Sequence, residues 1–416
     1  MWDLTPLESP LRPHCRAADR LLFWRPPSLP PLPPGLTEAM RDRMRETRAH
    51  SIADSTRGTY GAGLLLFHVF CDSHRIPEDQ RAPAQPLLVQ AFLASLVGGY
   101  SGSAVSNYLN GLHTWHTIHG VDWLLATTDL KPFLAAAKRI AVDVGIGKPP
   151  RSPYTVSDLE AICAQLDDAV SLDCAVKACV TATFWGIARV KEMTVVNLTD
   201  NSFNPVRHLK ITDVSEKWDA KLACQVTALH APSTKASPLT GEDIFFAQQL
   251  GPADAKKALA VHVRVNDPQP LEHLFTHTVI DGRGRAIRRP LSRSVFIARI
   301  KRASIAANII PKDGHSLRIG GTLEYLLRSV PFPVVQHHGR WAGNSFTKYL
   351  TKHAVIIAPY IQAPPSYSSA SSSAGPPRSP FPPLPTAVML DDAVTAISVP
   401  DPAAPSLPSI ELPPVR

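Results

Sequence analysis

The sequence has few cysteines, and they follow no binding pattern. Six occur in 416 residues. They are Cys15, Cys71, Cys163, Cys174, Cys179 and Cys224, with no Cys-x-x-Cys pair and no other paired spacing. This scatter is not typical of a zinc module or a disulfide scaffold, and it favours reduced, intracellular thiols.

Long hydrophobic runs are also missing. No stretch reaches the roughly 18 apolar residues that a membrane-spanning helix needs. The first residues, MWDLTPLESPLRPHC, carry acids and prolines where a secretory signal would need an apolar run. We therefore expect synthesis in the cytoplasm and no membrane partner.

Proline is abundant, and it is concentrated at the two ends. Of 41 prolines, nine lie in residues 1–38, the N-terminal leader, and fourteen in residues 363–416, the tail. Stretches such as RPPSLPPLPPG and SSASSSAGPPRSPFPPLP favour extended, solvated chain that cannot bury enough apolar surface to offset ordering. Both ends are predicted to be disordered.

The charge balance is basic. The net charge is +8, and because the leader is neutral and the tail is acidic, the excess lies in residues 39–362. A basic middle region favours an anionic partner, although solubility alone would also explain it.

Residues 39–144 show helical periodicity. Apolar residues recur every three or four positions in STRGTYGAGLLLFHVFCDSH, for which Asp54 and Ser55 are candidate caps. Further helices fit PLLVQAFLASLVG, SGSAVSNYLNGLHTWHTIHG and DLKPFLAAAKRIAVD. We predict a small helical bundle here. GIGKPPRSP, at 145–153, has no period and is typical of a linker between domains.

A second domain is predicted over residues 154–362. It opens with YTVSDLEAICAQL, where Thr155 and Asp158 have capping-box spacing, and continues with a long apolar helix. Short β-prone pieces such as HLKITDV and EDIFFA follow, and a helical pattern then returns. The predicted fold class is mainly α with a small β-sheet (α+β), with disordered Pro-rich ends.

Several polar and aromatic residues of this second domain stand out, but each alone has an ordinary explanation. Arg189, with Glu192 three residues on, could be a local helix ion pair. Lys235 lies between two β-prone pieces, as a solvated hairpin lysine would. Two further pairs, His315 with Arg318 in HSLR and Trp341 with Tyr349 in GRWAGNSFTKYL, could be chance spacing and core aromatics.

Together these residues supply what metal-free attack on a DNA phosphodiester requires. The hydroxyl of Tyr349 can act as a nucleophile that holds the phosphate covalently. Arg189 and Arg318 provide planar, permanently charged clamps for the non-bridging oxygens. Lys235 can protonate the leaving 5′ oxygen, and His315 can manage the tyrosine proton or hydrogen-bond the phosphate.

The sequence resembles the tyrosine recombinases, or phage-type integrases. GIARVKEM looks like the first-arginine box of that family, GHSLRIGGTLEYLL like its HxxR box, and GRWAGNSFTKYL like its closing box. The helices before the linker are similar to the family's core-binding, SAM-like domain. The resemblance covers about residues 50–362. The residues of the second and third boxes, HSLRIGG and GRW, are most similar to those of recombinases of eukaryotic, especially fungal, mobile elements.

The resemblance implies a catalytic domain over 154–362 that forms a 3′-phosphotyrosyl bond through Tyr349. It implies no metal, nucleotide or other cofactor. The partners would be double-stranded DNA and further copies of the chain in a homo-tetramer, with no small-molecule substrate. A C-terminal segment would pass to a neighbouring subunit, although little helix remains after HAVIIAPYIQ. The expected location is the nucleus.

The residue at the fifth catalytic position is open. Counting forward from Arg318, family spacing selects Trp341, whereas counting back from Tyr349 selects Arg340. Trp341 is preferred, because its indole N–H can donate to a phosphate while the ring packs the site. Arg340 and His338 are the alternatives.

A basic run lies in the second domain. RGRAIRRPLSRSVFIARIKR holds eight arginines or lysines from Arg283 to Arg302 and no acid, so it fits a solvated face, a DNA-backbone contact or a nuclear import signal.

Two other functional classes also fit the sequence. One alternative function is a domesticated, catalytically silent DNA-binding protein with a regulatory or architectural role. Another is a helical scaffold that binds partners through polyproline II segments.

Overall fold

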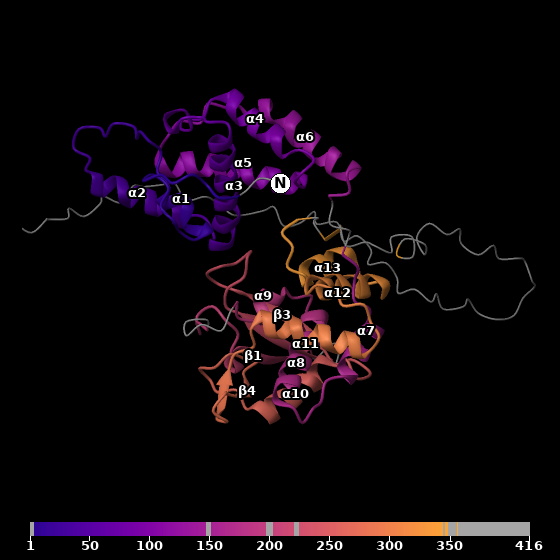
Figure 1. The fold of residues 1–416 in the computed structure, drawn as a ribbon. Coiled ribbons are helices and arrows are strands. Elements are labelled where there is room, and N and C mark those ends of the chain that lie inside the picture. Colours follow the sequence, from indigo (N-terminus) through magenta and orange to yellow (C-terminus); the bar gives the residue numbers. More distant parts are fainter. Residues whose placement is uncertain are drawn as a thin grey trace, which may run out of the picture. The chain divides into compact units, whose positions relative to one another are not determined.

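The structure is a computed structural model that describes residues 4–146, 151–196, 203–219, 224–343, 346–347 and 356. Most of the elements are helices, and small antiparallel sheets accompany them, so the α+β class is confirmed (Figure 1). Buried apolar side chains gather in two clusters, one within residues 21–137 and one within 154–317. The tail and residues 147–150 of the predicted linker lie outside the described residues. No helix in the described ranges is long and apolar enough to span a membrane.

The first cluster is formed by the helices of the N-terminal region. In chain order they are η1 (Ala17–Asp19), α1 (Arg20–Phe23), α2 (Glu38–His50), α3 (Asp54–Ser73), η2 (Glu78–Gln80), α4 (Pro86–Leu96), α5 (Gly102–His119) and α6 (Thr127–Asp143). Helices α3 and α5 approach closely because Gly63 and Gly111 have no side chain; a Cβ on Gly63 would overlap Tyr108, and one on Gly111 would overlap the Tyr60 carbonyl. The helical bundle predicted for this region is therefore present.

The start of α3 differs from the prediction. The N-cap is Ala53, and neither Asp54 nor Ser55 caps the helix. Asp54 instead stands in the first turn and pairs with Arg57. An acid at this position still favours the helix, because its charge opposes the positive end of the helix dipole.

The predicted disorder does not hold for the part of the leader from Arg12 to Trp24. Leu21 and Trp24 are buried in the first cluster. The Trp24 indole donates to the Pro13 carbonyl at 3.0 Å, and its carbonyl accepts from the Trp115 indole at 2.7 Å. The prediction averaged composition over the whole leader, and so missed a short proline-free stretch that carries two large apolar anchors.

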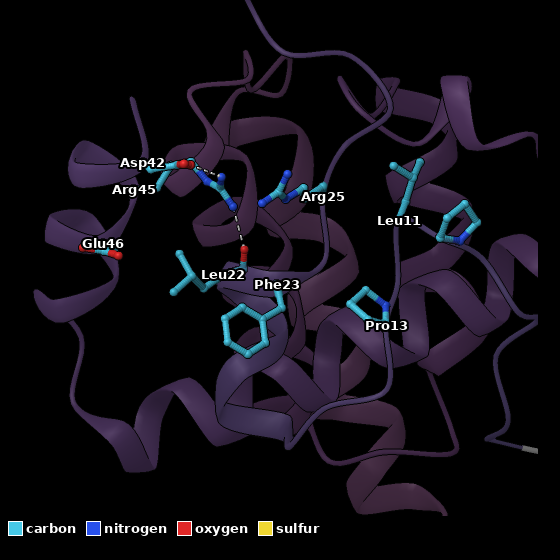
Figure 2. Close-up of a pocket in the computed structure, with 9 residues that line it drawn as sticks. Leu11, Pro13, Leu22, Phe23, Arg25, Asp42, Arg45 and Glu46 are labelled. Atoms are coloured by element: carbon cyan, nitrogen blue, oxygen red, sulfur yellow. Dashed lines mark hydrogen bonds and ion pairs between the residues drawn. The ribbon is translucent and has the colours of Figure 1, made fainter. Parts of the chain in front are cut away.

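Ion pairs also hold the leader to the helical bundle. The buried Arg12 contacts Asp72 and Glu78 at 2.9 Å each, and Arg81 contacts the other oxygen of Asp72 at 2.8 Å. Beside the leader, a hollow of about 530 Å³ lies between α1 and α2. Figure 2 shows Arg45 reaching from α2 to the carbonyl of Leu22. The leader is thus part of the folded unit.

Replacing Trp24 with alanine should lower the free energy of unfolding by about 3–5 kcal/mol, the usual cost of removing a buried aromatic side chain. The matched control is Phe23→Ala at the adjacent position, because Phe23 is half exposed and its loss should cost less than about 1 kcal/mol. Urea titrations of the full-length variants, followed by circular dichroism, measure both. Equal, small effects would mean that the leader does not contribute to the core.

The second cluster is built around one buried helix. In chain order the elements are α7 (Val156–Ala164), α8 (Ser171–Trp185), α9 (Val190–Met193), η3 (Ile211–Asp213), β1 (Val214–Asp219), β2 (Cys224–Ala231), β3 (Glu242–Ala247), α10 (Ala255–Asn266), β4 (His277–Ile280), β5 (Ala286–Arg289), α11 (Arg293–Ala306), α12 (His315–Leu327) and α13 (Phe332–His338). Twelve of the fifteen residues of α8 are buried, so this apolar helix lies in the core. The capping box of Thr155 and Asp158 is confirmed at α7.

Two small sheets flank these helices. Strands β1, β2 and β3 form an antiparallel sheet with β2 in the middle, and Leu229 of β2 pairs with Ile244 of β3, both fully buried. Strands β4 and β5 form a separate hairpin. The piece EDIFFA becomes β3, as predicted, whereas HLKITDV forms the 3-10 helix η3 and contributes only Val214 to β1. The β4–β5 hairpin also interrupts the stretch that was predicted to return to helix. Buried side chains of β2 and β3 join the second cluster.

Close contact between α12 and α8 depends on two adjacent glycines. A Cβ on Gly320 would overlap the Tyr154 carbonyl, and one on Gly321 would overlap the carbonyl of Phe184 near the end of α8. This close approach brings the first turn of α12, with His315 and Arg318, next to the loop that follows α8. The glycine pair thus positions the candidate site.

Candidate functional site

Arg318 lies at the centre of the candidate site. Its side chain is 1% exposed. Its guanidinium donates to the carbonyl oxygens of Ile187 and Gly339, which follow α8 and α13. The ring of Trp341 lies over the same guanidinium, with Cζ 4.2 Å from the ring centroid. Arg318 therefore joins three segments that are far apart in the sequence.

Arg189 and Arg340 share the carboxylate of Glu192. Nη1 of Arg189 lies 2.6 Å from Oε1, and Nη2 of Arg340 lies 2.8 Å from Oε2. The Glu192 side chain is 4% exposed, and it also accepts from the backbone N–H of Arg189 at 2.9 Å. The pair Arg189–Glu192 is therefore more than a local surface pair, because the acid orients both guanidiniums in a buried setting.

His315 lies in the field of the same cations. Burial lowers the pKa of His315 below its ordinary value, and three nearby guanidiniums lower it further. They belong to Arg151, Arg318 and Arg189. The lowered pKa of His315 favours the uncharged ring, the form that can accept a proton.

Trp341 and the segment after it pack together. The Phe346 ring lies 5.7 Å from the ring of Trp341 and 6.2 Å from that of Phe332 in α13, and Phe346 is buried. Tyr349, the predicted nucleophile, follows Phe346 by three residues and lies outside the described residues. The chain therefore enters the region of Trp341 just before Tyr349.

Lys235 lies on the loop between β2 and β3, as the hairpin prediction placed it. The loop is closed by two hydrogen bonds between Thr234 and Ser237, at 3.0 and 3.1 Å, and Lys235 is exposed. The next residue, Ala236, lines a hollow of about 450 Å³ together with Arg340 and Trp341. The lysine-bearing loop therefore borders the same region as the arginines.

The His338 side chain contacts the end of α8 and the side of α12. Its Nε2 lies 2.9 Å from the Trp185 carbonyl, and its ring packs edge-on against Tyr325. Burial lowers the pKa of His338, and so do the charges of Arg340, His337 and Arg318. Of the three candidates for the fifth position, Trp341 contacts Arg318 through its ring, and Arg340 shares the Glu192 carboxylate with Arg189.

Most of the residues selected from the sequence lie close together, but one of their contacts was not predicted. Arg189, His315, Arg318 and Trp341 come together, and Lys235 lies on a bordering loop. The second role of Glu192, as partner of Arg340, was not predicted, although the spacing of Arg189 and Glu192 was noted. No group of three or more metal-ligating side chains is assembled anywhere in the described ranges.

The basic run is only partly neutralised. Three of its arginines form ion pairs, namely Arg285 with Asp281, Arg288 with Glu272 and Arg299 with Asp173. The other five are exposed and form no ion pair within the described part of the chain: Arg283, Arg289, Arg293, Lys301 and Arg302. These five remain available to an anionic partner.

Replacing Glu192 with glutamine should lower the free energy of unfolding by about 3 kcal/mol or more, because two largely buried guanidiniums lose their counter-charge. The matched control is Glu324→Gln, which removes an exposed pair with Arg328 and should cost less than about 1 kcal/mol. Denaturant titration of both variants gives the comparison. A Glu192→Gln protein as stable as the control would contradict the shared-carboxylate arrangement.

The Glu192 carboxylate should also make the stability of the folded protein depend on pH in the acid range. Burial alone would raise the pKa of Glu192, but Arg340 and Arg189 together bring it below its ordinary value of 4.5. The folded chain therefore favours the carboxylate more than the unfolded chain does. Its contribution to stability is complete above pH 4.5 and is lost as the pH falls through the lowered pKa. Glu192→Gln should lack this part of the pH dependence.

No family model and no curated protein matches this sequence. Among solved structures, the chain is similar to a lambda integrase (75–356) dimer bound to a COC' core site, with 12% identity, a TM-score of 0.39, and coverage of 74% of this chain and 96% of that chain. It is similar to the XerH site-specific recombinase bound to palindromic difH substrate, with 13% identity, a TM-score of 0.43, and coverage of 82% and 91%. It is also similar to XerA recombinase, with 15% identity, a TM-score of 0.33, and coverage of 78% and 99%.

Proposed function

We propose that the protein is a tyrosine recombinase, a DNA strand transferase that cuts and rejoins duplex DNA through Tyr349. One observation carries the proposal: three boxes far apart in the sequence converge on one cluster of guanidiniums. Arg189 comes from the first box, His315 and Arg318 from the second, and Trp341 from the third. Several arginines together with a histidine that can accept a proton suit a phosphate that is held in place while the proton of the nucleophile is removed.

In the proposed reaction, the phenol oxygen of Tyr349 attacks the phosphorus of a DNA phosphodiester. A bond forms between that oxygen and phosphorus, and the bond from phosphorus to the 5′ oxygen breaks. His315 takes the phenolic proton, and Lys235 gives a proton to the departing 5′ oxygen. The product is a 3′-phosphotyrosyl link and a free 5′ hydroxyl. Attack by a 5′ hydroxyl on that link reverses the step and rejoins a strand.

The arginines would stabilise charge in this reaction. Phosphoryl transfer spreads negative charge over the non-bridging oxygens, and fixed donors aimed at those oxygens lower the barrier. Arg318 and Arg189 are held in place before substrate binds, the first by backbone carbonyls and the second by Glu192. Arg340 or Trp341 would complete the clamp.

The wider proposal follows the same family pattern. Duplex DNA is the partner, and the exposed cations of the basic run would add affinity that does not depend on sequence. We propose action as a homo-tetramer in the nucleus, with relatives among recombinases of eukaryotic mobile elements. The proposed domains are a core-binding domain over 39–144 and a catalytic domain over 154–362.

The test is formation of a covalent adduct on selected DNA. Duplexes that bind the full-length protein are recovered from a randomised pool, rebuilt with a nick beside the central positions, and incubated with protein in EDTA. The nick lets the short fragment that carries the new 5′ hydroxyl diffuse away, so a covalent complex should accumulate and survive a denaturing gel. Failure of every bound duplex to give an adduct would refute the activity.

The existing hydrogen bonds and ion pair of the arginines favour a second function, that of a DNA-binding protein without catalytic activity. Arg318 and Arg189 already have backbone or carboxylate partners, as they would in a purely structural role. A catalytically silent DNA-binding protein would show binding that weakens steeply with salt, but no adduct and no strand exchange. The same selected duplexes, titrated at several salt concentrations, separate this function from the first.

A further inference from the structure

A proline-rich loop of the leader is anchored to the helical bundle. It spans residues 25–36, RPPSLPPLPPGL, between α1 and α2. At its start the N–H of Arg25 donates to the Leu11 carbonyl at 2.9 Å, and in its middle Arg41 of α2 donates to the Pro30 carbonyl at 2.7 Å. At its end the N–H of Leu36 donates to the Pro33 carbonyl at 3.2 Å. The first two bonds tie the loop to neighbouring residues of the N-terminal region, and the third closes a turn within the loop.

Within the loop, Leu29–Pro33 is one uninterrupted stretch of five residues. It lies between a bend at Pro27–Ser28 and a turn at Pro34–Gly35 and contains no helix, strand, turn or bend. Proline fixes φ near the polyproline II value, and a residue that precedes proline is pushed toward the same extended region. Every residue of Leu29–Pro33 is either a proline or precedes one. The sequence therefore favours the polyproline II conformation for this run.

The run presents different residues to the protein and to solvent. A polyproline II helix has three residues per turn, so Leu29 and Leu32 share one edge. Both leucines are half-buried, whereas Pro30, Pro31 and Pro33 are exposed. The leucine edge is thus the more covered edge of the run, and the proline edges are exposed to solvent.

Backbone acceptors are also available along the run. The carbonyl oxygens of Leu29, Pro31 and Leu32 accept no hydrogen bond from the described part of the chain. Exposed prolines and open carbonyls are what an aromatic-lined groove binds: its rings pack against the prolines, and a tryptophan or tyrosine of the groove donates to a carbonyl.

We propose that Leu29–Pro33 is a docking segment for a protein domain with an aromatic-lined groove of the SH3 or WW kind. The anchored loop is already extended, so binding would cost little ordering entropy. This function is independent of strand transfer, because the loop belongs to the N-terminal cluster and uses none of the proposed catalytic residues.

The experiment titrates the full-length protein with a panel of purified SH3 and WW domains by calorimetry. At least one domain should bind with a Kd on the order of micromolar, and the double variant Pro30→Ala/Pro33→Ala should weaken that binding by about tenfold or more. Replacing the groove tryptophan of the bound domain with alanine should abolish binding. The proposal is overturned if no domain in the panel binds, or if either change leaves the affinity intact.

Two matched controls locate the site within the chain. Pro27→Ala changes an exposed proline of the same loop before the bend, and binding should persist. The sequence Pro-Pro-Leu-Pro occurs at 30–33 and again at 382–385, outside the described residues. Pro382→Ala/Pro385→Ala should therefore leave binding by the loop in place, and binding lost only in this tail variant would overturn the assignment. Thermal melting of each variant should match the native protein, because the replaced loop prolines are exposed.

Discussion

Replacing Tyr349 with phenylalanine should abolish the covalent protein–DNA adduct and leave DNA affinity within about twofold of the native value. The substitution removes only the phenol oxygen, which is the atom proposed to bond to phosphorus, and keeps the ring. Contacts to the DNA backbone by the cationic surface are unchanged, so binding should survive. The adduct is measured on a denaturing gel with the nicked duplex, and affinity is measured by anisotropy on the intact duplex.

A neighbouring tyrosine provides the control. Tyr360 is the next tyrosine after Tyr349 in the sequence, and Tyr360→Phe should form adduct at the native rate. If the adduct instead persists in Tyr349→Phe and disappears in Tyr360→Phe, the nucleophile is wrongly assigned even though the reaction class is right. Mass spectrometry of the peptide linked to DNA identifies the bonded residue directly.

Replacing Arg318 with methionine should slow cleavage by roughly 10³-fold, the usual scale for loss of a fixed donor to a developing anion. Methionine keeps apolar length beneath the Trp341 ring but removes the charge. It also leaves the carbonyls of Ile187 and Gly339 without these donors, so the free energy of unfolding should fall by about 1–3 kcal/mol. Single-turnover cleavage and denaturant titration measure the two effects separately.

Arg318→Lys distinguishes charge from geometry. Lysine restores the charge, but it lacks the planar fork that reaches two carbonyls at once, so cleavage should recover only in part. The control is Arg302→Met on the exposed face of α11, for which cleavage at saturating DNA should stay near the native rate. Native-like cleavage by Arg318→Met would remove this arginine from the proposed mechanism.

Much of the fold could be predicted because its signals are local. The α3 and α5 helices have apolar residues at helical spacing. Strand β3 is a short β-prone piece that comes directly after turn residues. The leader was mispredicted because composition was averaged over 38 residues, which hid the anchoring role of Leu21 and Trp24. The cap of α3 was mispredicted because Ala53 offers no side-chain acceptor and so gives no sequence signal.

The candidate site was predictable where its residues lie close in sequence. His315 and Arg318 share the first turn of α12, and Arg189 is the N-cap of α9, which contains Glu192. The contact between Glu192 and Arg340 joins positions 148 residues apart, and no local spacing indicates it. Likewise, the support of Arg318 by the Ile187 carbonyl depends on how α12 packs against the end of α8, which is a property of the folded chain.

The carboxylate that two guanidiniums share also constrains how this protein can diverge. A descendant that lost the acid at position 192 would keep two uncompensated cations in a buried place, and selection would act against it until position 340 also became neutral. Substitutions at 192 and 340 should therefore arise as linked pairs along a lineage. Independent drift at 340 beside an unchanging acid would mean that Arg189 alone maintains Glu192.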